Sequence, residues 1–207
     1  MAANEHLVTT MERLESLYGE KNPNAVIKEI DHLSNGYRKL IESAPFVAIA
    51  TCGPEGLDCS PKGDPAGFVR ILDDKTVAIP DRPGNNRLDG FRNIIRDPRI
   101  AVLFLIPGVG ETLRINGRAE ISVEPALMQS FAINGKLPRS VLIVHIETVY
   151  FHCSKAIVRS KLWDASTQID RKSLPSTGTI IAELSHGERG GETYDREAPE
   201  RIKAQLY

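Results

Sequence analysis

Residues able to hold a phosphate group gather in one short turn of the sequence. Residues 79–87 read Ile-Pro-Asp-Arg-Pro-Gly-Asn-Asn-Arg, and a helix-like segment follows at residues 88–96. Where a strand passes into a helix, the first backbone N–H groups are unpaired, the helix dipole attracts anions, and arginine can bind a phosphate through two hydrogen bonds. By itself, the turn is as compatible with a solvated loop as with an anion site.

Further polar and basic residues recur where other predicted strands end. A single basic residue is most often a solvated surface charge, so it is their repetition at strand ends that indicates a binding site. Pro61 cannot donate a backbone hydrogen bond to a central strand, and its strand is therefore predicted to lie at an edge or a bulge. In chain order the candidates are Ser60, Pro61, Lys62, Gly63, Arg82, Asn85, Asn86, Arg87, Arg114, Lys155 and Arg159.

Nucleophilic and metal chemistry find less support in the sequence. Cys153 follows His152, but neighbouring residues on a strand point to opposite faces, so a Cys–His dyad is not expected. Cys153 is instead predicted to be a buried structural cysteine. The three cysteines and five histidines show no metal-binding spacing, and no metal site is predicted. The glycine-rich nucleotide loops are absent as well.

The composition limits the classes of partner. A net charge of −1 over 207 residues gives no basic field for nucleic acid or an anionic membrane. Residues 1–10 lack the charged and apolar regions of a signal peptide. The longest apolar run, residues 100–109, is interrupted by Pro107 and Gly108 and is too short to span a bilayer. A cytoplasmic protein without nucleic-acid or membrane partners is expected.

The order of the predicted elements indicates a mainly β fold with marginal helices. Apolar residues at helical spacing predict two helices before Pro45, separated by residues 22–24. About seven short strands with hairpin turns follow, which favours an antiparallel barrel. Residues after Ser185 offer little to bury and are predicted to be mobile or to lie on a partner as an arm. We therefore divide the chain into an N-terminal helical segment packing on the barrel (1–44), a barrel domain (45–165) and a C-terminal extension or dimer arm (166–207).

At this level of detail the chain resembles the pyridoxamine 5′-phosphate oxidase-related class. The resemblance is carried by an ordered series of motifs: Phe46-Val-Ala-Ile-Ala-Thr51, Asp58-Cys-Ser-Pro-Lys-Gly-Asp64, the turn at 79–87, Asn93-Ile-Ile-Arg-Asp-Pro-Arg99, Thr112-Leu-Arg-Ile-Asn-Gly-Arg-Ala119 and Cys153-Ser-Lys-Ala156. It covers residues 45–163. It implies an FMN-binding split β-barrel of antiparallel, Greek-key type, and a homodimer that binds FMN between its subunits.

The resemblance also implies roles for individual residues. Ser60, Lys62 and Gly63 would lie along the ring and ribityl chain of FMN, and Pro61 would be a further cofactor-binding residue. Ile79 and Pro80 would contact the flavin. The phosphate would be held by Arg82, Asn85, Asn86 and Arg87. Thr112 and Arg114 would reach the cofactor, with the second subunit as one possible source. Lys155 and Arg159 would stand near the flavin or its substrate.

The sequence also departs from the authentic oxidase. The arginine-rich strand of that enzyme is replaced by Pro61-Lys-Gly-Asp-Pro65, and the histidine that helps to recognise pyridoxal phosphate has no counterpart near Arg159. The leading hypothesis is therefore an FMN-dependent oxidoreductase for an unidentified small molecule, with NADH or NADPH as candidate electron donors and no catalytic side chain assigned. The alternatives are a flavin-binding carrier or sensor without turnover, and a haem- or deazaflavin-binding relative on the same barrel.

Overall fold

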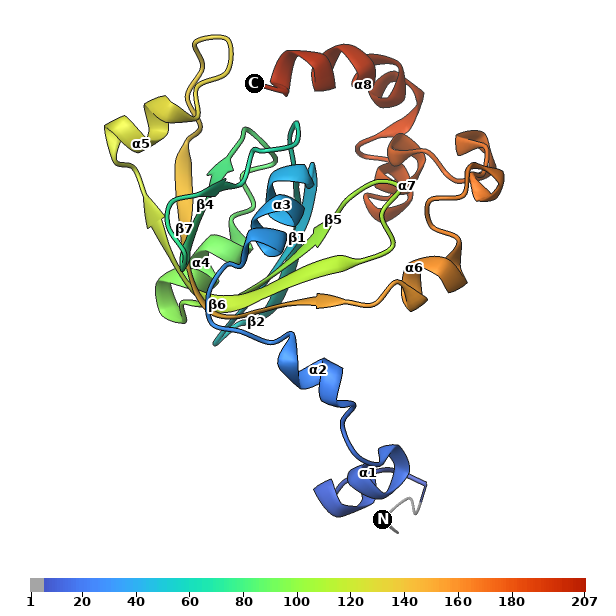
Figure 1. The fold of residues 1–207 in the computed structure, drawn as a ribbon. Helices are drawn as coiled ribbons and strands as arrows, with labels where there is room; N and C mark the ends of the chain where they lie inside the picture. Colours follow the sequence, from blue (N-terminus) through green and yellow to red (C-terminus); the bar gives the residue numbers. More distant parts are fainter. Residues whose placement is uncertain (1–5) are drawn as a thin grey trace.

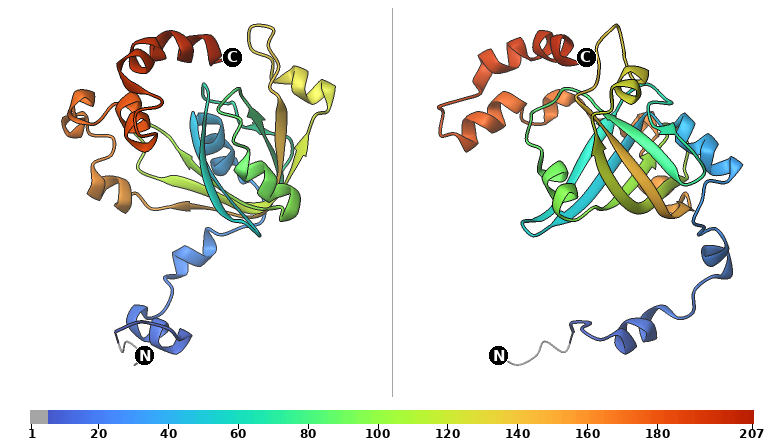
Figure 2. Two further views of the ribbon diagram at one scale, coloured as in Figure 1. Left: turned by 180° about the vertical axis from the view of Figure 1, so that it is seen from behind. Right: turned by 90° about the vertical axis from the view of Figure 1, so that its left-hand side faces the viewer.

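The core of the protein is a single antiparallel sheet of seven strands. The computed structural model describes residues 6–207, and its strand order is β2-β1-β5-β6-β7-β4-β3. The strands are β1 (Phe46–Gly53), β2 (Gly56–Gly63), β3 (Arg70–Ile71), β4 (Thr76–Asp81), β5 (Arg99–Leu105), β6 (Thr112–Ser122) and β7 (Ser140–His152). Figures 1 and 2 show the sheet curled so that β2 and β4 approach each other without pairing in the ladder. This open seam makes the fold a split barrel.

Buried and more exposed side chains alternate along the strands, and the buried ones form the core. In β1, Val47, Ile49 and Thr51 are buried, while the residues between them are half-exposed. Because the side-chain period of a strand is two, this pattern turns one face of the sheet toward the core. The largest buried side chains include Phe104, Leu113 and Ile115 from the central strands.

A bulge between β6 and β7 bends the long central ribbon. The pairing shifts between Asn116 and Gly117, so that Glu147 is left without a partner in the register. A Cβ atom at residue 117 would lie 2.0 Å from the backbone oxygen of His145. Only glycine allows the two strands to approach this closely, and the bend curls the sheet toward its seam.

The N-terminal helices differ from the two predicted. The first is α1 (Met11–Tyr18), but the second divides into α2 (Pro23–Ile27) and α3 (Asn35–Ser43). The prediction of a continuous second helix was wrong because Ile30 pairs with Val149 through two backbone hydrogen bonds of 3.1 and 2.7 Å, and Ser34 then caps α3. Tyr37 and Ile41 of α3 are buried in the core, whereas α1 and α2 have no buried residue and extend away from the sheet (Figure 1).

The remaining helices are α4 (Asp89–Arg96), α5 (Pro125–Ser130), α6 (Lys155–Ser160), α7 (Thr177–Leu184) and α8 (Gly191–Gln205), with short 3-10 turns at Ala165–Thr167 and Arg171–Ser173. The tail after Ser185 is therefore helical over most of its length. The amide of Gly178 donates to Asp195 over 2.7 Å and joins α7 to α8. Within residues 6–207, no helix is both long and apolar enough to cross a membrane.

Candidate functional site

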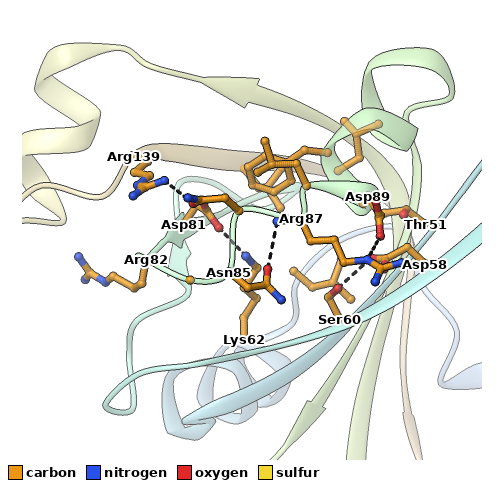
Figure 3. Close-up of a pocket in the computed structure, with 18 residues that line it drawn as sticks. Thr51, Asp58, Ser60, Lys62, Asp81, Arg82, Asn85, Arg87, Asp89 and Arg139 are labelled. Atoms are coloured by element: carbon orange, nitrogen blue, oxygen red, sulfur yellow. Dashed lines mark hydrogen bonds and ion pairs between the residues drawn. The ribbon is translucent and has the colours of Figure 1, made fainter. Parts of the chain in front are cut away.

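The seam of the barrel contains a cavity of about 160 Å³. β2 contributes Asp58, Ser60 and Lys62 on its inner face, and Asp81 and Arg82 come from the end of β4. The turn before α4 and the first turn of α4 close the opposite side (Figure 3). Apolar side chains line its floor: Ile49, Leu88, Phe91, Ile94 and Leu142. The cavity therefore combines an apolar wall with a charged rim.

Two ion pairs of opposite polarity cross the seam. Lys62 of β2 pairs with Asp81 of β4, and Arg82 Nε donates to Asp64 Oδ2 over 2.7 Å. The Asp64 side chain is only 2% exposed and that of Arg82 only 15%, so the second pair is buried. Arg82 Nη1 also donates to the backbone oxygen of Phe131 over 3.0 Å. Arg82 thus has a structural role that the phosphate prediction did not foresee.

The turn between β4 and α4 has the form expected of an anion site. Asn85 Oδ1 accepts a hydrogen bond from the amide of Arg87 over 3.1 Å, and Asn86 and Leu88 have φ values of 59° and 60°. No side chain caps the N-terminus of α4. Its first amides are therefore left for water or a ligand, and the helix dipole favours an anion there.

The two arginines of the turn do not converge. Figure 3 shows Arg87 beside Asp58 and Asp89, while Arg82 lies on the other side of the cavity. Arg87 pairs with Asp89, and this carboxylate raises the pKa of the Arg87 guanidinium. With 79% of its side chain exposed, Arg87 can turn to an incoming phosphate at little cost.

Four charged residues of the rim were not predicted from the sequence. Arg139, the residue before β7, donates to Asn86 Oδ1, and its amide donates to the backbone oxygen of Asp81 over 3.0 Å. The other three are the carboxylates Asp58, Asp81 and Asp89. The inward alternation of β2 would have indicated Asp58, but Arg139 lies more than fifty residues from the turn and carries no local signal.

A second cavity of about 360 Å³ adjoins the first and shares Ser60, Lys62, Arg82, Gly84 and Asn85 with it. Pro61, Gly63 and Pro80, all sequence candidates, line it together with Phe68 and Pro83. Ligand pockets commonly measure about 300–1,000 Å³, so the two cavities together are large enough for a cofactor-sized molecule.

The other predicted site residues lie elsewhere in the chain. Ile79 is 1% exposed within the core and lines neither cavity. Thr112 pairs with His152 at one end of β7, whereas the phosphate turn is next to Ser140 at the other end. Arg114 lies near Thr112, and Lys155 and Arg159 are exposed on α6. Within one chain these four residues do not reach the cavities.

Arg114 belongs instead to a cluster of cations at that far end. Its Nη1 donates to the Tyr150 hydroxyl over 2.8 Å, and the ring of His152 lies 5.1 Å from that of Tyr150. Burial, followed by the charges of Arg114 and Lys28, lowers the pKa of His152. Its Nε2 is buried without a hydrogen-bond partner among the described residues.

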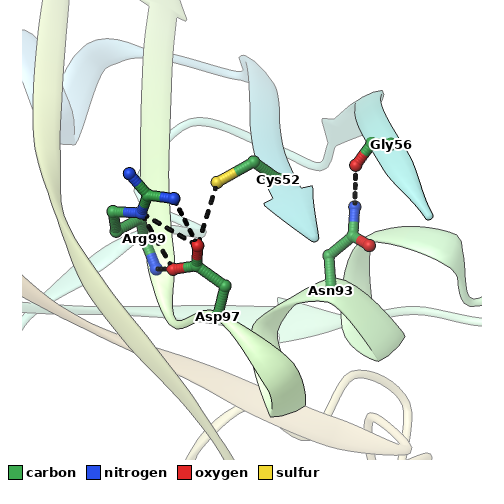
Figure 4. Close-up of polar contacts among 5 residues, drawn as sticks. All are labelled: Cys52, Gly56, Asn93, Asp97 and Arg99. Carbon is green, nitrogen blue, oxygen red and sulfur yellow. Dashed lines mark hydrogen bonds and ion pairs between the residues drawn. The ribbon is translucent and has the colours of Figure 1, made fainter. Parts of the chain in front are cut away.

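Close packing holds α4 against β1 and β2. Asn93 is buried and donates to Thr51 Oγ1 over 3.2 Å and to the backbone oxygen of Gly56 over 3.4 Å. At the end of the helix, Asp97 accepts hydrogen bonds from Arg99 and from Cys52 Sγ (Figure 4), and the Arg99 bonds hold the pKa of the Asp97 carboxyl well below its usual range. These contacts fix the helix whose N-terminus faces the cavity.

Cysteine and metal chemistry remain without structural support. Cys153 is exposed, so the prediction of a buried structural cysteine was wrong. Cys59 is also exposed, Cys52 is half-buried, and none of the three is in a disulfide. Residues 6–207 contain no group of three or more histidine, cysteine or acidic side chains arranged to hold a metal ion.

Comparison with known proteins decides the family. The family model for pyridoxamine 5′-phosphate oxidase matches residues 33–153, which is more than half of the chain. The chain belongs to the pyridoxamine 5′-phosphate oxidase family. The matched segment runs from the residues before α3 to the end of β7 and contains both cavities. None of the curated proteins compared with the chain matches it.

Several solved structures are similar to a little more than half of the chain. HupZ of Group A Streptococcus is 24% identical, with a TM-score of 0.45 over 56% of this chain and 91% of that one. A putative pyridoxamine 5′-phosphate oxidase of Lactobacillus delbrueckii is 19% identical, with a TM-score of 0.46 over 58% and 95%. General Stress Protein 26 of Bacillus anthracis is 16% identical, with a TM-score of 0.42 over 55% and 88%.

Proposed function

We propose that the chain binds FMN at the seam of its barrel and acts, as a homodimer, as a flavin-dependent oxidoreductase on a small molecule. The observation that carries the proposal is the composition of the first cavity. An apolar floor there faces the exposed Arg87 of the turn, the exposed Arg139 next to β7, and the uncapped start of α4. A planar ring and a phosphate on one molecule would match these two parts.

The side chains present fit this cofactor. Arg87, Arg139 and the first amides of α4 would hold the phosphate, since charge-assisted hydrogen bonds from guanidinium groups and helix N-termini suit that group. The negative charges of Asp58 and Asp89 would repel the phosphate. Arg87 must therefore leave Asp89 and pair with the phosphate when FMN binds. Lys62, held by Asp81, would lie along the ribityl chain and the ring.

When bound, FMN would supply hydride or electron transfer. The residues of this chain would orient it and exclude water from its ring, with Phe91 and Ile94 as the apolar wall. Substrate and electron donor, with NADH and NADPH as candidates, would approach through the second cavity. Neither cavity is lined by a histidine or a cysteine, the usual protein ligands of haem iron, so the lining favours flavin over haem.

A homodimer would bring the distant candidates to the site. Leu103 of β5 pairs with Ala48 of β1 and with Arg114 of β6, so the three side chains share the outer face of the sheet. On the same face Phe46 is 40% exposed and Leu57 is 88% exposed. Apolar exposure on the same face as Arg114 supports a second subunit here, whose Thr112, Arg114, Lys155 and Arg159 would then approach the flavin.

The proposal is tested by measuring the affinities for FMN and for riboflavin, which lacks the phosphate. In the Arg87→Ala/Arg139→Ala variant, FMN affinity should fall about a hundredfold because two charge-assisted contacts are lost, whereas riboflavin affinity should not change. Arg118→Ala, on the exposed side of β6, is the matched control. Equal losses for both flavins would remove the phosphate assignment. Bound FMN that no nicotinamide cofactor reduces would favour a carrier or sensor.

A further inference from the structure

The N-terminal arm, residues 7–27, exposes an apolar stripe on α1. Met11, Leu14 and Tyr18 lie on one side of the helix at spacings of three and four residues, and all three are exposed. Thr10 caps the start of α1, and Gly19 ends it with a φ of 70°. Because a helix of two turns is marginally stable in water by itself, a capped one with an apolar stripe is expected to pack on another surface.

The base of the arm is fixed and directs α1 away from its own barrel. Ile30 is bridged to Val149, and the Tyr37 hydroxyl donates to the backbone oxygen of Lys28 over 2.5 Å. The Lys28 ammonium group lies 4.8 Å from the centre of the Phe151 ring. Beyond this base, Figures 1 and 2 show α2 and α1 extending away from the sheet, with α1 well apart from α6. The surface on which the stripe packs therefore belongs to another molecule.

A second apolar surface lies on residues 155–174, which we call the basic segment and which begins with α6. Trp163 Nε1 donates to the backbone oxygen of Val109 over 2.8 Å and holds the segment against the turn between β5 and β6. The segment is thus tied to the barrel while its large apolar side chains stay exposed: Val158, Leu162, Trp163, Ile169 and Leu174.

Charge distinguishes the basic segment from the other end of the chain. Residues 11–20 contain three acidic residues and one basic residue, whereas residues 155–174 contain five basic and two acidic residues, and all of these are exposed. The helices α7 and α8 also expose apolar side chains, but residues 177–207 contain six acidic and four basic residues. An acidic helix is attracted to the basic segment and repelled by the α7–α8 surface.

We infer that α1 of one subunit docks on the basic segment of a second copy of this chain. The chain carries both halves of the contact, and its arm points away from its own basic segment, so two copies exchange arms about a two-fold axis. Each exchanged arm also holds α6, which carries Lys155 and Arg159, the residues that the proposed function brings to the flavin of the facing subunit. The inference rests on the homodimer of that proposal and does not require FMN.

The first test is cross-linking of the full chain with a carbodiimide, which joins a carboxylate directly to a lysine in contact with it. Chains labelled with ¹⁴N and with ¹⁵N are refolded together from urea, and native mass spectrometry verifies that mixed dimers have formed. Cross-linked peptides that join residues 11–20 to residues 155–174 should then include pairs with one label on each side. Pairs that always carry a single label would show that the arm folds back within its own chain.

The second test measures dimer dissociation by analytical ultracentrifugation. Leu14→Lys should weaken the dimer about a hundredfold or more, because the lost apolar contact occurs twice in a two-fold dimer. Ser16→Lys adds the same charge to the polar side of α1 and is the matched control, with at most a small effect expected. Glu12→Lys/Glu15→Lys should weaken the dimer roughly tenfold, and adding Lys161→Glu/Lys172→Glu should recover the loss.

The inference is overturned if mixed-label pairs are absent from mixed dimers, if Leu14→Lys and Ser16→Lys dissociate alike, or if the second charge reversal recovers nothing. An FMN titration of the same preparation separates this result from the proposed function. Mixed-label pairs in a dimer that does not bind FMN would contradict the proposed function alone. A dimer that binds FMN but yields no mixed-label pair would contradict the arm exchange alone.

Discussion

Replacing Arg82 with methionine should destabilise the protein far more than replacing Arg87. Without Arg82, the Asp64 carboxylate, 2% exposed, keeps only the Tyr207 hydroxyl as a side-chain partner. Breaking a buried ion pair from one side costs about 3–5 kcal/mol, and the 15% exposure of Arg82 places this case near about 3 kcal/mol. For a chain of this length, such a loss lowers Tm by about 6–12 °C.

Thermal and urea unfolding of the flavin-free protein provide the measurement, with Arg87→Met as the matched control. Arg87 is 79% exposed, and its loss should leave Tm unchanged. Adding Asp64→Asn to Arg82→Met should recover about 1–2 kcal/mol, because the uncompensated charge is removed. The reasoning is refuted if Arg82→Met and Arg87→Met unfold at the same temperature, or if the double variant is no more stable than Arg82→Met.

Three further perturbations test other parts of the structure. Burial lowers the pKa of His152 in the folded protein. As the pH drops through 6.5 the unfolded chain therefore takes up a proton first, and the free energy of unfolding should fall. His152→Gln should reduce this pH dependence in unfolding curves measured between pH 7.5 and 5. Gly117→Ala places a Cβ 2.0 Å from the backbone oxygen of His145, and should cost about 3 kcal/mol or more in urea unfolding. Gly90→Ala places a Cβ 2.7 Å from Asp58 Oδ2 at the cavity rim, and should weaken FMN binding in a flavin titration with only a small change in Tm.

Local sequence signals were sufficient for much of the sheet. A tight turn at residues 53–56 joins β1 to β2, one of the hairpin turns expected between the predicted strands, because Pro54 fixes one backbone angle and Gly56 permits a positive φ. The strand containing Pro61 was predicted at an edge, and β2 is an edge strand. Where a tertiary contact competes with helical spacing, the same signals failed: Ile30 pairs with Val149 and divides the predicted second helix.

The site was predictable only as far as it depends on strand ends. Lys62 and the turn after β4 meet because both border the seam. Nothing near Arg82 in the sequence shows that its side chain is held by Asp64, eighteen residues earlier and across the seam. Arg139 precedes β7 and Tyr207 follows α8, and the positions of their side chains depend on how the sheet curls and how the C-terminal tail packs.

The most direct test of the central claim is a fluorescence titration of the flavin-free protein with FMN and with riboflavin. If a phosphate seat at the seam holds the cofactor, FMN should bind at least about a hundredfold more tightly than riboflavin, since the phosphate adds two or more charge-assisted contacts. Equal affinity for the two flavins, or binding of neither, would contradict the claim.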